Sequence, residues 1–183
     1  MDELSQQTEH KDIGITGILN KLDNSVCNTF INMLTVDAID RPKQFAIAAV
    51  VIDPRDESRF LAVKRPSHAK SLPDVWGLPA IIVKHDEKPE MAVIRLAWEK
   101  LNTQVEFLGC LDLASIDRGD YELTLMDVVV RLVGKEPSVW EASTKQTKYV
   151  QQQWTDDLSI LQEAASKGSI CSRILLQSQG ITY

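Results

Sequence analysis

The fold is decided by residues 76–102, WGLPAIIVKHDEKPEMAVIRLAWEKLN. The apolar run Ala80–Val83 near the start of this stretch has the length and composition of a short buried strand. Pro89 followed by Glu90 then marks the beginning of a helix, because proline suits the first turn and an acidic side chain there faces the positive end of the helix dipole. That helix is expected to continue to about Asn102.

Two apolar runs before this stretch predict a β-hairpin. The first, Phe45–Ile52, is continuous, and the second, Arg59–Lys64, follows the turn sequence DPRDES. After the helix, strands are expected at Val105–Ile116, Tyr121–Val133 and Tyr149–Trp154, and one or two closing helices in the tail. Strands, a helix, more strands and a final helix predict an α/β sandwich with a mixed central sheet.

Ahead of the hairpin, apolar residues at spacings of three and four predict one or two amphipathic helices between Ile15 and Leu34. A division at Asn24-Ser25 would leave Ser25 as the N-cap of the second helix. We interpret residues 1–40 as an N-terminal helical extension and residues 41–183 as the main domain. Packing of the extension on the domain is expected from its apolar stripe, while a homodimer surface and a lid remain alternatives.

The length, composition and net charge of the chain limit the classes of protein to which it can belong. A chain of 183 residues with 44% hydrophobic content can bury one substantial core and is short for two ordinary domains. Its longest apolar stretch ends at Asp53, far short of the roughly 20 residues of a membrane-spanning helix. The acidic N-terminus has no feature of a secretion signal, so no membrane partner and a cytoplasmic location are expected. A net charge of −6 argues against duplex nucleic acid but permits a small phosphorylated or nucleotide ligand in a locally basic cleft.

The cysteines give no sign of a metal site. Cys27, Cys110 and Cys171 are widely separated and have no close Cys or His partner in the sequence. A zinc site needs about four clustered ligands. The three side chains are therefore predicted to be buried, reduced thiols.

The order of these elements, with the Trp-Gly-Leu-Pro lead-in, resembles the Nudix fold over roughly residues 44–165 and implies a Nudix-like α/β/α sandwich. The family's box is a glycine, five residues, a glutamate, seven residues and then Arg-Glu-aliphatic-any-Glu-Glu-any-Gly. With Arg95 on the arginine, Glu87 stands at the first glutamate and Glu99 at the first of the paired glutamates. Four positions depart from the box: Ile81 at the glycine, Leu96 at the glutamate after the arginine, Lys100 at the second paired glutamate and Asn102 at the closing glycine.

The resemblance implies hydrolysis of a nucleoside diphosphate linked to another group, with Mg²⁺ held by glutamates on one face of the box helix. Positions 96, 99 and 100 of that face here carry an alkyl group, a carboxylate and an ammonium. Glu99 is the candidate metal ligand, but Lys100 beside it repels the ion by several kcal/mol at an effective dielectric constant of about 20. The box therefore predicts a hydrolase homologue that holds Mg²⁺ weakly and whose catalysis is impaired or absent.

The resemblance assigns roles to five residues. Glu87 and Arg95 match the pair in which the arginine orients the loop carboxylate, and an ordinary helix-cap ion pair is the alternative. Lys64 and Arg65 match basic residues that contact phosphate or ribose in some members, and solvated charges at a strand end are the alternative. Glu141 lies in the loop where some relatives place their general base.

Three functions remain open at this point. In the first, the chain is an enzyme with reduced activity that binds metal at the box helix. In the second, it is a binding module in which Lys100 replaces the metal as counter-charge for a nucleotide phosphate. In the third, it is an interaction protein whose cleft is unused. The sequence identifies neither the nucleotide nor the oligomeric state.

Overall fold

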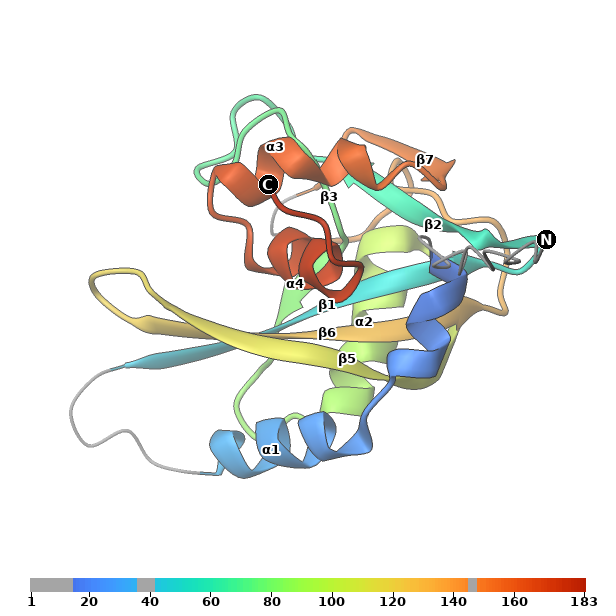
Figure 1. The fold of residues 1–183 in the computed structure, drawn as a ribbon. Coiled ribbons are helices and arrows are strands. Elements are labelled where there is room, and N and C mark those ends of the chain that lie inside the picture. Colours follow the sequence, from blue (N-terminus) through green and yellow to red (C-terminus); the bar gives the residue numbers. More distant parts are fainter. Residues whose placement is uncertain (1–14, 36–41, 145–147) are drawn as a thin grey trace, which may run out of the picture.

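The computed structural model describes residues 15–35, 42–144 and 148–183. A seven-stranded mixed sheet lies at its centre, with helices on both faces (Figure 1). This confirms the α/β/α sandwich expected from the sequence, although the boundary expected at residues 40 and 41 falls outside the described residues. The elements in chain order are η1 (Ile15–Lys21), α1 (Asn24–Leu34), β1 (Lys43–Asp53), β2 (Asp56–Lys64), β3 (Trp76–Gly77), β4 (Ala80–Ile82), α2 (Pro89–Leu101), β5 (Val105–Asp117), β6 (Glu122–Leu132), β7 (Gln151–Thr155), η2 (Leu158–Leu161), α3 (Gln162–Ser166) and α4 (Ile170–Ser178).

The sheet forks next to its central strand. The main strand order is β3-β2-β1-β6-β5, and β1 pairs with β6 in parallel. The hairpin partners β1 and β2 pair only near their turn, where Ile52 faces Phe60 and Asp53 faces Asp56. Further along, β1 pairs with β4, whereas β2 pairs with β7 and β3. Leu78 and Pro79, between β3 and β4, connect the two branches of the fork.

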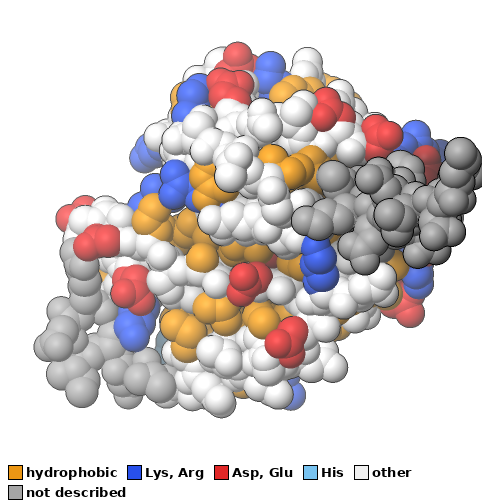
Figure 2. Space-filling model, in the orientation of Figure 1, with side chains coloured by type: hydrophobic (Ala, Val, Ile, Leu, Met, Phe, Trp, Pro, Cys, Tyr) orange, Lys and Arg blue, Asp and Glu red, His pale blue; other side chains and the backbone are white. Residues whose placement is uncertain are grey.

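Alternate side chains of β1 enter two different hydrophobic cores. Ala48 and Val50 face the core covered by η1, η2, α3 and α4, while Ala49 and Val51 face the core covered by α1 and α2. Both faces of the strand are buried, as is usual for strands of a parallel pair. On the face drawn in Figure 2, hydrophobic side chains gather in a band between α4 and α1, where β5 crosses the molecule (Figure 1). None of the helices within the described ranges has both the length and the apolar character needed to cross a bilayer.

The N-terminal helices pack on opposite faces of the sheet. Ile15 and Ile18 of η1 are buried in one core and Phe30 of α1 in the other. The expected first helix is a 3₁₀ helix, and the predicted cap was wrong. Asp23 caps α1 instead, because its carboxylate accepts a hydrogen bond of 2.7 Å from the backbone N–H of Ser25.

Between these helices the chain crosses the edge strand β5. The backbone N–H of Asp23 donates a hydrogen bond of 3.0 Å to the carbonyl of Cys110. Leu22 lies against Gly109, where an added Cβ would come within 3.1 Å of its side chain. Cys27 forms a disulfide with Cys110 with a Cα–Cα distance of 5.9 Å, so the prediction of reduced thiols was wrong for this pair. Cys171 is free and buried, as predicted. Covering an edge strand protects its unpaired backbone groups.

Loss of the disulfide is expected to lower the free energy of unfolding by about 4 to 5 kcal/mol. The bond joins residues separated by 83 positions, and cross-linking so long a loop restricts the unfolded chain. Urea unfolding of wild type with and without dithiothreitol measures the effect, and Cys27→Ser provides the control that should not respond to the reductant. Equal midpoints for oxidised and reduced wild type would contradict the expectation.

Because disulfides are rare in a reducing cytosol, the bond is also a reason to test the predicted cytoplasmic location.

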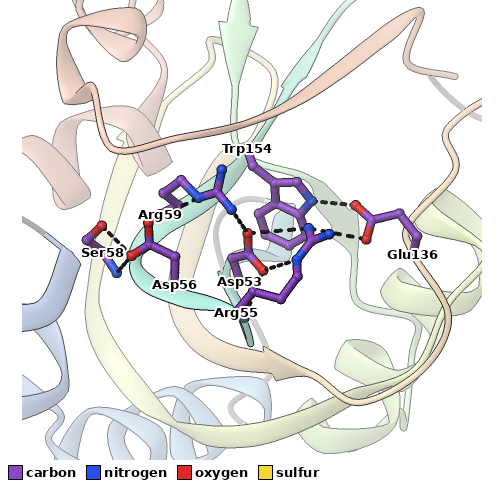
Figure 3. Close-up of polar contacts among 7 residues, drawn as sticks. All are labelled: Asp53, Arg55, Asp56, Ser58, Arg59, Glu136 and Trp154. Carbon is purple, nitrogen blue, oxygen red and sulfur yellow. Dashed lines mark hydrogen bonds and ion pairs between the residues drawn. The ribbon is translucent and has the colours of Figure 1, made fainter.

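A buried carboxylate anchors the turn of the β1–β2 hairpin (Figure 3). Asp53 is fully buried and accepts hydrogen bonds from the backbone and side chain of Arg55 and from the side chain of Arg59. Burial raises the pKa of Asp53, but the hydrogen bonds from Arg55 and the charges of both arginines outweigh burial and lower the pKa. Glu136 pairs with Arg55 at 3.4 Å and accepts a hydrogen bond from the indole of Trp154. The cluster thus fastens the segment after β6 to the hairpin and β7.

A second buried carboxyl group, Asp127 of β6, has no such partners. Neither of its oxygens has a hydrogen-bond partner among the described residues. Asp127 pairs with Ala48 of β1 on one side and with Asp112 of β5 on the other. Burial raises the pKa of Asp127 well above its ordinary value, and the charge of Asp112 adds to the shift. The carboxyl group is therefore neutral in the folded chain at pH values where it ionises in the unfolded chain.

Asp127 is expected to destabilise the fold increasingly as the pH rises. A raised folded pKa means that the full stability is present below the unfolded pKa, near 4, and is lost as the pH rises towards the folded value. Asp127→Asn does not titrate, so its urea midpoint relative to wild type should increase between about pH 4 and pH 8. A difference in midpoint that stays constant over this range would refute the assignment.

Candidate functional site

A cavity of about 240 Å³ lies at the fork of the sheet. Val63 of β2, the two residues of β3 and all three of β4 line one side. The cavity extends to Ala46 of β1, Leu125 of β6 and Ile170 at the beginning of α4. Segments from both branches of the fork therefore line one space. Ligand sites in α/β proteins are commonly clefts between such segments.

The cavity is electropositive. Arg65, Lys100 and Arg118 line it, and none of its described lining residues is acidic. Lys100 is only 2% exposed, with its ammonium 5.7 Å from the ring centre of Tyr149. Burial lowers the pKa of Lys100 to about 8, and the charge of Arg65 contributes in the same direction. The buried Nε of Arg65 has no hydrogen-bond partner in the described part of the chain. Such donors suit an anion.

Beside the cavity, Glu87, Arg95 and Glu99 form one chain of ion pairs. Arg95 donates two hydrogen bonds of 2.7 Å to the two carboxylate oxygens of Glu87, and a third of 2.7 Å to the carbonyl of Ile82. One Glu87 oxygen also accepts the backbone N–H of Lys84 at 2.8 Å. The hydrogen bonds from Arg95 are the main cause of the lowered pKa of Glu87. Glu99 lies 3.6 Å from Arg95.

Two of the predicted site residues point elsewhere. Lys64 forms an ion pair of 2.9 Å with Asp74, and it does not line the cavity as its neighbour Arg65 does. Glu141 is exposed and accepts hydrogen bonds from Asn102 at 2.6 Å and Lys135 at 3.0 Å. The hydrogen bond from Lys135 is the main cause of the lowered pKa of Glu141. The structure thus brings Arg65 and Lys100 together and separates Lys64 and Glu141 from them.

Other lining residues were not identified as candidates from the sequence. Tyr149 is buried, its hydroxyl accepts the backbone N–H of Ala80 at 2.9 Å, and burial raises its pKa to about 12. Arg118 lies in the turn between β5 and β6, where the sequence indicated only a turn. Trp76 lines the cavity and packs against the adjacent core. No local sequence pattern marks Tyr149 or Arg118, since only the tertiary fold brings them to the cavity.

The sequence matches the NUDIX domain over residues 42–157, which is more than half of the chain. The chain belongs to the Nudix family. No curated protein matches the sequence. The family membership accounts for the order of the hairpin, β4 and the Nudix helix α2.

Solved structures share this Nudix fold at low sequence identity. The MutT protein of Methanosarcina mazei Go1 is 13% identical with a TM-score of 0.56, over 78% of this chain and 94% of that one. A MutT NUDIX hydrolase from Burkholderia pseudomallei is 20% identical with a TM-score of 0.53, over 65% and 86%. The NUDIX domain of Shewanella oneidensis NrtR, complexed with ADP ribose, is 16% identical with a TM-score of 0.53, over 82% and 94%. At sequence identities this low, the structural similarity shows a shared fold only.

The residues along the Nudix helix do not fit a tightly held Mg²⁺ ion. Hard cations require several oxygen ligands, of which one or two are usually carboxylates. Both oxygens of Glu87 are engaged by Arg95, and Glu99 faces the same guanidinium. Leu96 is buried in the core, and position 100 carries an ammonium. Within residues 15–35, 42–144 and 148–183, no three His, Cys, Asp or Glu side chains are placed to hold a metal ion.

Wild type is therefore expected to show no saturable Mg²⁺ binding at millimolar concentrations, because the carboxylates are paired with Arg95 and Lys100 repels the ion. Calorimetry of Mg²⁺ with wild type, Glu99→Gln and Lys100→Glu tests this, and only Lys100→Glu should gain affinity. Tight binding to wild type that disappears in Glu99→Gln would mean that the site holds the metal after all.

Proposed function

We propose that this Nudix-family chain binds a small phosphorylated ligand in the cavity at Lys100, with the ammonium in place of a divalent metal. Hydrolysis of a phosphoanhydride is impaired or absent. The supporting observation is the concentration of three basic side chains and no acidic one around one cavity, in a chain whose net charge is −6. A phosphate group carries the charge and the acceptor oxygens that such a site requires.

The depth of Lys100 strengthens this proposal. Burying a charged group is costly, and a like charge in the same site raises the cost. Lys100 is almost fully buried, and the charge of Arg65, which lines the same cavity, lowers the pKa of Lys100, whereas the charge of Glu99 acts in the opposite direction. An anionic ligand beside Lys100 and Arg65 would offset the repulsion between the two cations.

The proposed loss of hydrolysis follows from the same residues. A Nudix reaction needs a divalent ion to neutralise developing charge and to orient water. The carboxylates of Glu87 and Glu99 are directed towards Arg95, and Glu141 is held by Asn102 and Lys135. The lysine at position 100 places a cationic side chain where hydrolysis requires a ligand for the metal ion.

A weak hydrolase is the second candidate. The retained Glu87–Arg95 pair favours it, because both side chains are only 12–14% exposed and occupy matching positions of the Nudix box. The complex of the Shewanella domain with ADP ribose makes that molecule a suitable probe substrate. In this alternative, Glu99 holds Mg²⁺ with help from the substrate phosphates.

Inorganic pyrophosphate and ADP ribose are expected to bind wild type in the presence of a chelator. Lys100→Met should weaken this binding about tenfold to a hundredfold, because it removes a charge-assisted hydrogen bond of about 1.5 to 3 kcal/mol. Calorimetry gives the dissociation constants, and phosphate release measures any hydrolysis.

Lys43→Met serves as the matched control, since Lys43 is exposed at the beginning of β1 and does not line the cavity. Its dissociation constants should equal those of wild type. The binding proposal is wrong if neither probe binds in chelator. Hydrolysis that requires Mg²⁺ and Glu99 would favour the weak hydrolase.

A further inference from the structure

Building on the proposed function, we propose that the ligand's phosphate is attached to a short hydrocarbon group rather than to a nucleoside. The phosphate would lie at Lys100 and Arg65. The hydrocarbon would extend along the apolar part of the cavity, formed by Ala46, Leu125 and Ile170.

The cavity has few side chains that can accept hydrogen bonds from a nucleobase. None of its described lining residues has a carboxylate, an amide or an imidazole, and the charged side chains Arg65, Lys100 and Arg118 only donate hydrogen bonds. Hydroxyl groups are therefore the main side-chain acceptors along the cavity. Burying the amino groups of a base without acceptors is unfavourable, because each unpaired donor loses its hydrogen bond to water. A hydrocarbon has no such groups to satisfy.

Two of the hydroxyl groups that line the cavity, those of Ser169 and Tyr149, already have partners. Ser169 contacts the hydroxyl of Ser172 at 3.0 Å and the sulfur of Cys171 at 3.3 Å. The hydroxyl of Tyr149 accepts the backbone N–H of Ala80. These bonds keep the polar groups occupied within the protein, so the inner surface facing a ligand is mainly apolar.

The backbone around the cavity is also largely engaged. The strand β4 is paired with β1, and the carbonyl of Pro79 accepts the N–H of Ala49 at 2.9 Å. Pro79 has no N–H of its own. The backbone of β3 is paired with β2 on one side. Main-chain groups therefore give little substitute for the missing side chains.

The size of the cavity limits the hydrocarbon. An apolar cavity of about 150 Å³ in another protein accommodates benzene, so a comparable packing fills the present 240 Å³ with roughly ten atoms other than hydrogen. A phosphate uses about half of that space. The remaining volume suits a group of about five or six carbons.

A homologous series of alkyl phosphates tests the inference. Calorimetry in chelator compares inorganic phosphate, ethyl, butyl, hexyl and octyl phosphate with AMP on wild type. Each added methylene should strengthen binding about fourfold, as expected when a CH₂ group leaves water, until about hexyl phosphate. Octyl phosphate should show no further gain, and AMP should bind no more tightly than ethyl phosphate.

A variant can move the chain length at which the gain stops. Leu123 lines the cavity from β6 and is only partly buried, so Leu123→Ala enlarges the cavity with modest risk to the fold. Octyl phosphate should then bind more tightly than hexyl phosphate. Ile94→Ala, on the exposed side of α2, is the matched control and should reproduce the wild-type series.

The outcomes separate this inference from the proposal on which it rests. Equal affinity across the alkyl series, or AMP binding tenfold more tightly than hexyl phosphate, overturns the hydrocarbon assignment and leaves phosphate binding in place. If no phosphate compound in the series binds, the proposed function itself fails. A gain of about fourfold per methylene that ends near six carbons supports both.

Discussion

The arrangement of the site depends on the paired hydrogen bonds between Arg95 and Glu87. With its further contacts to the carbonyl of Ile82 and to Glu99, one guanidinium joins β4, the following loop and α2. Both oxygens of Glu87 are committed to this structure, and the lowered pKa keeps the carboxylate ionised. Arg95 is thereby the ion-pair partner of both Glu87 and Glu99. The charged side chains that line the adjoining cavity are Arg65, Lys100 and Arg118.

The fork of the sheet gives Lys100 its importance. Because β2 leaves β1 soon after their turn, a space opens that α2 reaches with its last turn and β2 reaches with its end. Lys100 and Arg65 both line this space, and Lys100 is almost fully buried there. Charge interactions are stronger at such positions than on the surface, since water screens them less. Two local cations can therefore attract an anion despite the negative charge of the whole chain.

Much of the fold could be predicted from the pattern of apolar residues. The hairpin, the helix beginning at Pro89 and the pair of long strands β5 and β6 all follow from local periodicity and turn residues. The two-residue strand β3 was not predicted, because so short a strand has no period of its own. The parallel pairing of β1 with β6 and the Cys27–Cys110 disulfide were also missed. Both join segments that are far apart in sequence, and no local pattern specifies such pairings.

For the site, residue spacing alone predicted which chemical groups stand at the box positions: Glu87, Arg95 and Glu99 match the family pattern, and Lys100 stands where the pattern has a carboxylate. Residue spacing is enough for that, because the box lies within one loop and one helix. Only the tertiary structure decided that Lys100 and Arg65 line one cavity whereas Lys64 pairs with Asp74. The direction of a side chain and its neighbours across the fork depend on how strands and helices pack, and packing is a property of the whole chain.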